Sequence, residues 1–148
     1  MPLPDEDALL IDQLGKVAGR GGGGAGARFT ARRLKKDVRE VRLETDLAPQ
    51  AALSRAQQLL SDQGQAVATD TDPADGSAIR GVVGTGIGGL NPAVVTLTVT
   101  PAATGDGSVV LVRGAAKEGL IKQRGGTKAA ERLVTAWLTA DPTAGPVD

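Results

Sequence analysis

The chain has 148 residues and contains no cysteine, no histidine and no tyrosine. Without cysteine it forms no disulfide and carries out no thiol chemistry, and without histidine it has no Ser-His-Asp triad and no ordinary zinc site. Its aromatic residues are a single phenylalanine, Phe29, and a single tryptophan, Trp137. A protein that stacks the bases of single-stranded nucleic acid needs several aromatic faces, so this class of function is disfavoured.

An excess of one charge is also missing, as are long apolar runs. Seventeen basic residues balance seventeen acidic ones, so no overall field attracts nucleic acid or an anionic membrane. No apolar run approaches the roughly 20 residues that span a bilayer, and the N-terminus lacks the basic and apolar regions of a signal peptide. We therefore expect a soluble cytoplasmic protein with no membrane span. A length of 148 residues favours one domain with a single core.

Charge is unevenly distributed near the N-terminus. Residues 1–12 carry four acidic residues and no basic one, whereas residues 16–42 carry nine basic and two acidic residues, a net charge of +7 (9 minus 2). A short amphipathic helix is predicted over residues 5–18, followed by a glycine-rich linker over residues 20–27. We expect residues 1–36 to be a flexible arm, whose helix either frays or docks on a partner or on the fold.

Two strands that are predicted to pair over residues 93–116 form the centre of the expected fold. In residues 93–100, Val95, Leu97 and Val99 alternate with threonines, so one face is apolar and the other polar. A turn of small and acidic residues, 104–108, leads to a second apolar run over residues 109–116. The apolar face requires a cover, whereas the threonine face can remain in water.

The other predicted elements supply that cover. Strands are predicted over residues 38–46, 65–69 and 78–83, and helices over residues 50–63 and 127–140. The order β-α-β-β-β-β-α places two helices on one face of an antiparallel sheet of about five strands, a two-layer α+β sandwich. This order resembles that of TBP-like and helix-grip-like architectures, in element order only. The domain is expected over residues 37–140, with Trp137 as its anchor and a disordered tail over residues 141–148.

The segment from Gly84 to Gly89 contains the pattern G-x-G-x-x-G after a predicted strand. A dinucleotide site requires a helix directly after this pattern, whereas Pro92 and another strand follow here. Gly84, Gly86, Gly88 and Gly89 therefore predict a mobile loop between two strands, or a lid over a small pocket.

A basic segment precedes the last predicted helix. Free backbone N–H groups at the start of a helix, flanked by cations, can hold an anion. The alternative is that Thr127 caps the helix and that the charges are solvated. The candidate ligand- or anion-binding residues are Lys117, Lys122, Arg124, Gly125, Gly126, Thr127 and Lys128.

Patterns of catalytic or metal-binding residues are missing. Residues 70–76 are rich in aspartate, but the third aspartate and the glycine come one residue late for an EF-hand loop, so we predict a turn. Glu118 beside Lys117 is a close acid–base pair, yet neighbouring residues of a strand point to opposite faces. We therefore predict no enzymatic activity, no metal site and no cofactor.

The first functional hypothesis is a non-enzymatic binding or adaptor domain with an unknown protein partner. The alternatives are a carrier of a small anionic or amphipathic ligand, held between the sheet and the last helix, and a weak nucleic-acid contact through the basic residues 28–36. A cavity lined by valine and leucine would favour the carrier, whereas a solid core with an exposed apolar patch would favour the adaptor. An uncovered edge strand would also allow a homodimer.

Overall fold

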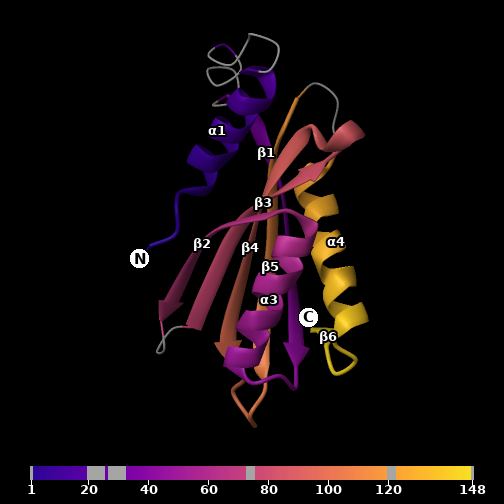
Figure 1. Cartoon of the computed structure of the whole chain (residues 1–148). Helices are drawn as coiled ribbons and strands as arrows, with labels where there is room; N and C mark the ends of the chain where they lie inside the picture. Colours follow the sequence, from indigo (N-terminus) through magenta and orange to yellow (C-terminus); the bar gives the residue numbers. More distant parts are fainter. Residues whose placement is uncertain (1, 20–25, 27–32, 73–75, 120–122, 148) are drawn as a thin grey trace.

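The computed structural model describes residues 2–19, 26, 33–72, 76–119 and 123–147 (Figure 1). Its strands are β1 (Lys35–Thr45), β2 (Gln65–Asp72), β3 (Gly76–Thr85), β4 (Asn91–Pro101), β5 (Ser108–Glu118) and β6 (Gly145–Val147). Its helices are α1 (Glu6–Gly19), α3 (Pro49–Gln63) and α4 (Gly125–Ala140), with the short 3-10 helix η1 (Ile87–Gly89). All strands join one antiparallel sheet in the order β2-β3-β4-β5-β1-β6. The expected α+β fold is confirmed.

The predicted hairpin forms the middle of this sheet. β4 pairs with β5 along its length, from Ala93 opposite Ala116 to Pro101 opposite Ser108. β3 and β1 extend the pair on its two sides, β2 forms one edge, and β6 covers part of the other. The described residues therefore form six strands rather than about five, because the segment after α4 adds the short strand β6.

Helices α3 and α4 cover one face of the sheet and enclose the main core (Figure 1). Val95, Leu97 and Val112 of the central strands belong to one apolar cluster with Leu133 and Trp137 of α4, and all five are fully buried. The prediction that Trp137 anchors the core is confirmed.

Two glycines allow α4 to lie directly on the sheet. A Cβ atom on Gly126 would lie 2.0 Å from the carbonyl oxygen of Asp37, and one on Gly114 would lie 2.2 Å from the carbonyl oxygen of Gly126. Such separations are far below van der Waals contact, so no larger residue fits without moving the helix. Backbone of α4 therefore contacts backbone of β1 and β5 at this end of the sheet.

Helix α1 lies on the opposite face of the sheet, which the sequence predicts to be in water (Figure 1). Leu10 is fully buried against Val94 and Ala115, and Thr96 is 7% exposed. The helix therefore follows the self-docking alternative and adds a third layer where it lies. Most of the predicted linker 20–27 is outside the described residues. That residues 37–140 fold without the arm stays a prediction; β1 already begins at Lys35.

The residues after α4 are attached to the fold. The carboxylate of Asp141, a residue that is 3% exposed, accepts hydrogen bonds from Trp137 Nε1 at 3.1 Å and from the hydroxyl of Thr45. It also accepts bonds from the amide and hydroxyl of Thr143, at 3.0 and 2.7 Å. β6 then pairs with β1. Residues 141–147 thus differ from the disordered tail that the sequence predicts, because one buried carboxylate gathers these donors around it.

Candidate functional site

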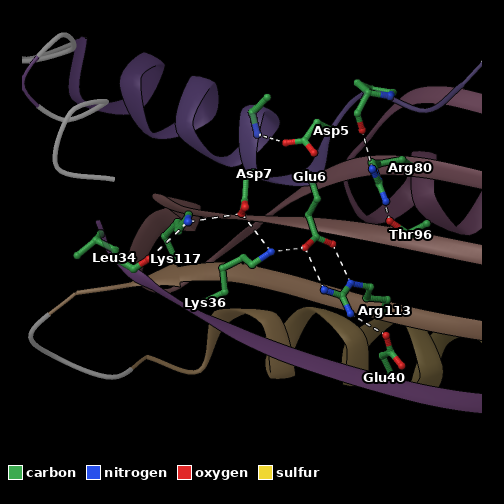
Figure 2. Close-up of polar contacts among 12 residues, drawn as sticks. Asp5, Glu6, Asp7, Leu34, Lys36, Glu40, Arg80, Thr96, Arg113 and Lys117 are labelled. Carbon is green, nitrogen blue, oxygen red and sulfur yellow. Dashed lines mark hydrogen bonds and ion pairs between the residues drawn. The ribbon is translucent and has the colours of Figure 1, made fainter. Parts of the chain in front are cut away.

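Charged side chains from α1, β1 and β5 meet on the face of the sheet that carries α1 (Figure 2). At its centre, Glu6 Oε2 accepts a hydrogen bond from Arg113 Nε at 2.9 Å, and Glu6 Oε1 accepts one from Arg113 Nη2 at 3.1 Å. Lys36 Nζ lies 3.0 Å from the same Oε1 atom. Arg113 also donates from Nη1 to Glu40 at 2.7 Å. The α1 clasp is the set of six residues Glu6, Asp7, Lys36, Glu40, Arg113 and Lys117.

The remaining members of the α1 clasp surround Asp7. Asp7 Oδ1 lies 3.1 Å from Lys36 Nζ and 3.5 Å from Lys117 Nζ. The side chain of Lys117 is only 6% exposed, and its ammonium group also donates to the carbonyl of Leu34 at 3.4 Å. A buried ammonium group requires such partners, because burial without them carries a large desolvation cost. Asp7 and Leu34 thus hold a cation that the sheet would otherwise bury uncompensated.

Strand register brings the four sheet residues of the α1 clasp onto one face. Lys36 lies opposite Lys117 and Glu40 lies opposite Arg113 in the antiparallel pair of β1 and β5. Each strand contributes two residues that are four positions apart, and an even spacing keeps side chains on the same face. The sequence shows the acidic start of α1 and the basic strands separately. It does not show that they meet, because Glu6 and Arg113 are 107 positions apart.

The chain before α1 is also bound to this face. Asp5 begins the helix, since its carboxylate accepts a hydrogen bond from the amide of Ala8 at 2.9 Å. Arg80 of β3 donates from Nη1 to the carbonyl of Pro4 at 2.6 Å and from Nε to Thr96 Oγ1 at 2.8 Å (Figure 2). A fourth cation therefore faces the start of α1.

Both carboxylates of α1 in the clasp are held in their charged form. Burial acts to raise the pKa of Glu6, but the hydrogen bonds from Arg113 and Lys36 outweigh it and lower this pKa below its ordinary value of 4.5. The hydrogen bond from Lys36 lowers the pKa of Asp7 in spite of its burial. Hydrogen bonds to Glu6 raise the pKa of Lys36 and of Arg113. Glu6, Asp7, Lys36 and Arg113 are therefore ionised at neutral pH.

The predicted anion-binding segment is divided between the two faces of the sheet. Lys117 faces α1, whereas Gly125, Gly126 and Thr127 are buried at the start of α4 on the other face. Arg124 and Lys128 are exposed, and Lys122 lies outside the described residues. Among the described residues, Lys117 is therefore separated from those at the start of α4.

Carboxylates of the chain itself occupy donors at the start of α4. Glu118 accepts hydrogen bonds from the amides of Gln123 and Gly125, at 2.7 and 2.9 Å. Asp37 accepts one from the amide of Thr127 at 2.7 Å and one from its hydroxyl at 3.2 Å. An external anion would have to displace these groups. Anion binding at this helix start stays a prediction.

The glycine loop lies beside the start of α4. A Cβ atom on Gly86, whose φ is +71°, would lie 2.8 Å from Gln123 Oε1, and one on Gly125 would lie 2.6 Å from Asn91 Nδ2. Arg132 of α4 donates to the carbonyl of Gly84 at 3.1 Å. The two segments that the sequence singles out are therefore neighbours. Gly88 and Gly89 also have positive φ, and the mobility of this loop stays a prediction.

Other sequence-based hypotheses concern residues that the structure describes only in part. Of the basic segment 28–36, residues 28–32 are outside the described part, Lys35 is exposed, and Lys36 belongs to the α1 clasp. Among the described residues, no group of three or more acidic side chains is placed to hold a metal ion. None of the described helices is long and apolar enough to cross a membrane.

A hollow of about 650 Å³ lies at the far end of the strands from α1, between the β4–β5 connection and β6. Arg42 and Glu44 of β1 and Thr100 of β4 contribute to its lining. Asp46 and Asp106 add two further carboxyl groups, so acidic side chains outnumber the single guanidinium. This excess of negative charge favours a polar or cationic ligand over an anionic one.

No protein-family model matches the chain, and no curated protein matches it. The solution structure of an Arabidopsis thaliana member of the major latex protein family is similar over 68% of this chain and 95% of that one, with 12% identity and a TM-score of 0.38. The crystal structure of the Mll3558 protein from Rhizobium loti is similar over 72% of this chain and 97% of that one, with 11% identity and a TM-score of 0.33. The di-domain ARO/CYC StfQ from the steffimycin biosynthetic pathway is similar over 80% of this chain and 56% of that one, with 11% identity and a TM-score of 0.34. At this level of similarity, none of the three assigns a function to the chain.

Proposed function

We propose that the chain is a cytoplasmic, non-enzymatic binding module for a protein partner, and that its interaction surface is the sheet face that carries α1. The α1 clasp is the observation that carries this proposal. It gathers Lys36, Arg113 and Lys117 on one face around Glu6 and Asp7, two carboxylates that belong to a helix and not to the sheet. Val38, opposite Ala115 on the same face, is 39% exposed and adds an apolar surface. Charged groups around an apolar centre are typical of protein interfaces.

The roles of three carboxylates at the two ends of α4 support a non-enzymatic module. Asp37 and Glu118 bind the first turn of α4, and Asp141 binds the segment that follows it. Burial acts to raise the pKa of Asp141, but hydrogen bonds from Thr45, Thr143 and Trp137 lower it below 3.8. A general acid needs a raised pKa, so a lowered one favours a structural role.

The filled core supports a surface interaction over a ligand held beneath α4. The central apolar side chains of both layers are fully buried, and backbone meets backbone at Gly114 and Gly126. A ligand between the sheet and α4 would have to separate these contacts. Recognition on the outer surface requires no such opening.

Affinity capture with a charge-reversed variant tests this proposal. The immobilised full chain, its Arg113→Glu variant and an Arg39→Glu control are exposed to a cell lysate, and the captured proteins are quantified by mass spectrometry. Arg39 is exposed on β1, and its neighbours Val38 and Glu40 occupy the α1 face, so its side chain points to the other side. We expect a partner that the wild type and Arg39→Glu retain and Arg113→Glu loses. Equal capture by all three chains, or no specific capture, would contradict the proposal.

A second candidate function is a small-ligand carrier, and the hollow beside β6 favours it. Its volume of about 650 Å³ is within the range of small-molecule sites, roughly 300–1,000 Å³. Amide NMR shifts on addition of phosphate, a fatty acid or a polyamine would test this candidate. Shifts confined to Thr100, Val109 and Thr143 would support a carrier. Unchanged spectra with all three probes would contradict the carrier function.

A further inference from the structure

Helix α1 is attached to the sheet by charge and by a small apolar contact. Its fully buried apolar side chain is Leu10, which packs with Val94 and Ala115, and Leu9 is partly buried beside them. By contrast, α4 buries Leu133 and Trp137 in the main core. An isolated helix of 14 residues is marginal in water. The docked state of α1 therefore depends on the α1 clasp.

The sheet face is complementary to one kind of helix. It presents cations from three strands, Lys36 of β1, Arg80 of β3, and Arg113 and Lys117 of β5, beside the apolar pair Val94 and Ala115. A helix that fits carries acidic residues in its first turn and a leucine four positions after the first of them. This spacing places the carboxylate and the leucine on the same side. Glu6 and Leu10 have this arrangement.

Removal of α1 would take charge partners and an apolar cover away from this face. Lys117 would lose Asp7, Arg113 would lose Glu6, and Val94 with Ala115 would lose its cover. Arg113 would keep Glu40, and among the described residues Lys117 would keep only the carbonyl of Leu34. A face with this excess of positive charge beside an apolar patch favours another acidic amphipathic segment.

We propose that this face is a receptor for an acidic amphipathic helix of a partner protein, and that α1 occupies it as an internal competitor. This inference rests on the proposed function and adds the chemistry of the partner and its regulation. Because α1 belongs to the same chain, its effective concentration at the face is high, on the order of millimolar for segments joined within one chain. A partner helix therefore binds only when its affinity and concentration are high enough to displace α1.

A foreign helix fits this arrangement better than the α1 helix of a second copy. Thirteen residues separate Gly19 from Arg33, and they include five glycines, at 21–24 and 26. Exchange of segments between copies is promoted by short connections, and thirteen residues are more than a usual connection of about 4–6 residues. The experiment must therefore distinguish a partner helix from the α1 helix of a second copy.

The test uses a fluorescent synthetic peptide with the sequence of residues 2–19 as the probe. Its binding to the full chain is compared with its binding to an undocked chain, the full-length Glu6→Lys, Leu10→Asp variant. We expect the undocked chain to bind the peptide at least about tenfold more tightly than the wild type, because its own α1 no longer competes. Raising the salt from about 50 to about 500 mM should weaken this binding. Equal, weak binding to both chains would overturn the inference.

Two matched controls keep the outcome specific. Adding Arg113→Glu to the undocked chain should abolish peptide binding, whereas adding Arg39→Glu should leave it unchanged. A peptide with Glu6→Lys should not bind the undocked chain. This control changes the probe and leaves the protein, and therefore its fold, unchanged. If neither Arg113→Glu in the protein nor Glu6→Lys in the peptide weakens binding, the inference is overturned. Urea unfolding followed by Trp137 fluorescence confirms that each variant is folded.

Further measurements separate the inference from the proposed function and from self-association. If the captured partner is lost with Arg113→Glu but is not displaced by the peptide, the binding module stands and the helix-receptor inference fails. If the peptide binds and no partner is captured, the proposed function fails and the receptor property stands. Wild-type dimers in light scattering that disappear in the undocked chain would assign the face to a second copy and overturn the foreign partner.

Discussion

Trp137 shows how one residue can join two parts of the molecule. Its ring is fully buried in the main core, and its Nε1 atom donates to Asp141 at 3.1 Å. Asp141 in turn binds Thr45 at the end of β1 and Thr143 before β6. The side chain with the largest apolar area in the core therefore also fixes the position of the C-terminal segment.

Replacement of Trp137 should be severe for this reason. We expect Trp137→Ala to lower the free energy of unfolding by about 3–5 kcal/mol through the cavity that it leaves. Trp137→Phe keeps most of the apolar ring and removes the indole N–H group, so its cost should be smaller. Urea unfolding followed by circular dichroism measures both. A loss below about 1 kcal/mol for Trp137→Ala would contradict this account of the core.

Gly126 is a residue whose importance lies in the absence of a side chain. In Gly126→Ala, the new Cβ atom would meet the carbonyl oxygen of Asp37 at 2.0 Å, so α4 must move away from β1. We expect a loss of stability of about 1–3 kcal/mol, the usual cost of overpacking. Gly145→Ala is the matched control, since nothing lies within 4 Å of its Cβ position. Equal thermal unfolding temperatures for the two variants would show that the close approach is not required.

Among the elements, α1 differs from α3 and α4 in what holds it to the sheet. The other two helices share the main apolar cluster, whereas α1 contributes Leu9 and Leu10 to a second, small one. Because its attachment depends on Glu6, α1 should open without unfolding of the core. Local opening of this kind is measurable by hydrogen exchange.

We therefore expect Glu6→Gln to remove the exchange protection of α1 amides while the amides of β4 and β5 stay protected. The neutral side chain gives up the charge-assisted bonds to Arg113 and Lys36. Lys16→Gln is the control within the same helix, because its ion pair with Asp12 is exposed on both sides and contributes little. If the α1 amides of Glu6→Gln stay as well protected as those of Lys16→Gln, α1 is held by packing and not by the bonds of Glu6.

At the scale of the whole molecule, low pH weakens the attachment of two segments, α1 and residues 141–147. Glu6 and Asp141 have pKa values below their ordinary values of 4.5 and 3.8. A carboxyl whose pKa is lowered by folding contributes stability that is fully present above its unfolded-state pKa and lost as the pH falls through its folded-state pKa. Acid should therefore release α1 and loosen the segment after α4.

We expect the free energy of unfolding to vary little with these groups at neutral pH and to decline once the pH falls below about 4.5. In Asp141→Asn, the part of the decline below about pH 3.8 should be smaller, although the variant is less stable at neutral pH. Urea unfolding at a series of pH values measures both slopes. Parallel curves for the two chains would show that Asp141 does not contribute to the acid sensitivity.

Most elements of this fold could be predicted from local patterns. The alternation of Val95, Leu97 and Val99 predicts β4, and Pro49 and the leucines of residues 50–63 predict α3. Gly64 lies at the C-terminal end of α3, where its amide donates to the carbonyl of Leu60 at 2.9 Å, and a Cβ atom there would meet the carbonyl oxygen of Val82 at 2.2 Å. Such a contact between distant segments leaves no local signal.

Periodicity and turn residues act between neighbours in the chain, and they were sufficient to identify an α+β protein with a hairpin at its centre. The α1 clasp and the buried Asp141 arise instead from tertiary structure. Glu6 meets Arg113 across 107 positions, and Thr45 meets Asp141 across 96. Only the pairing of β1 with β5 and the placement of α4 on the sheet bring these groups within hydrogen-bonding distance, because register and packing, not spacing along the chain, set which charges meet.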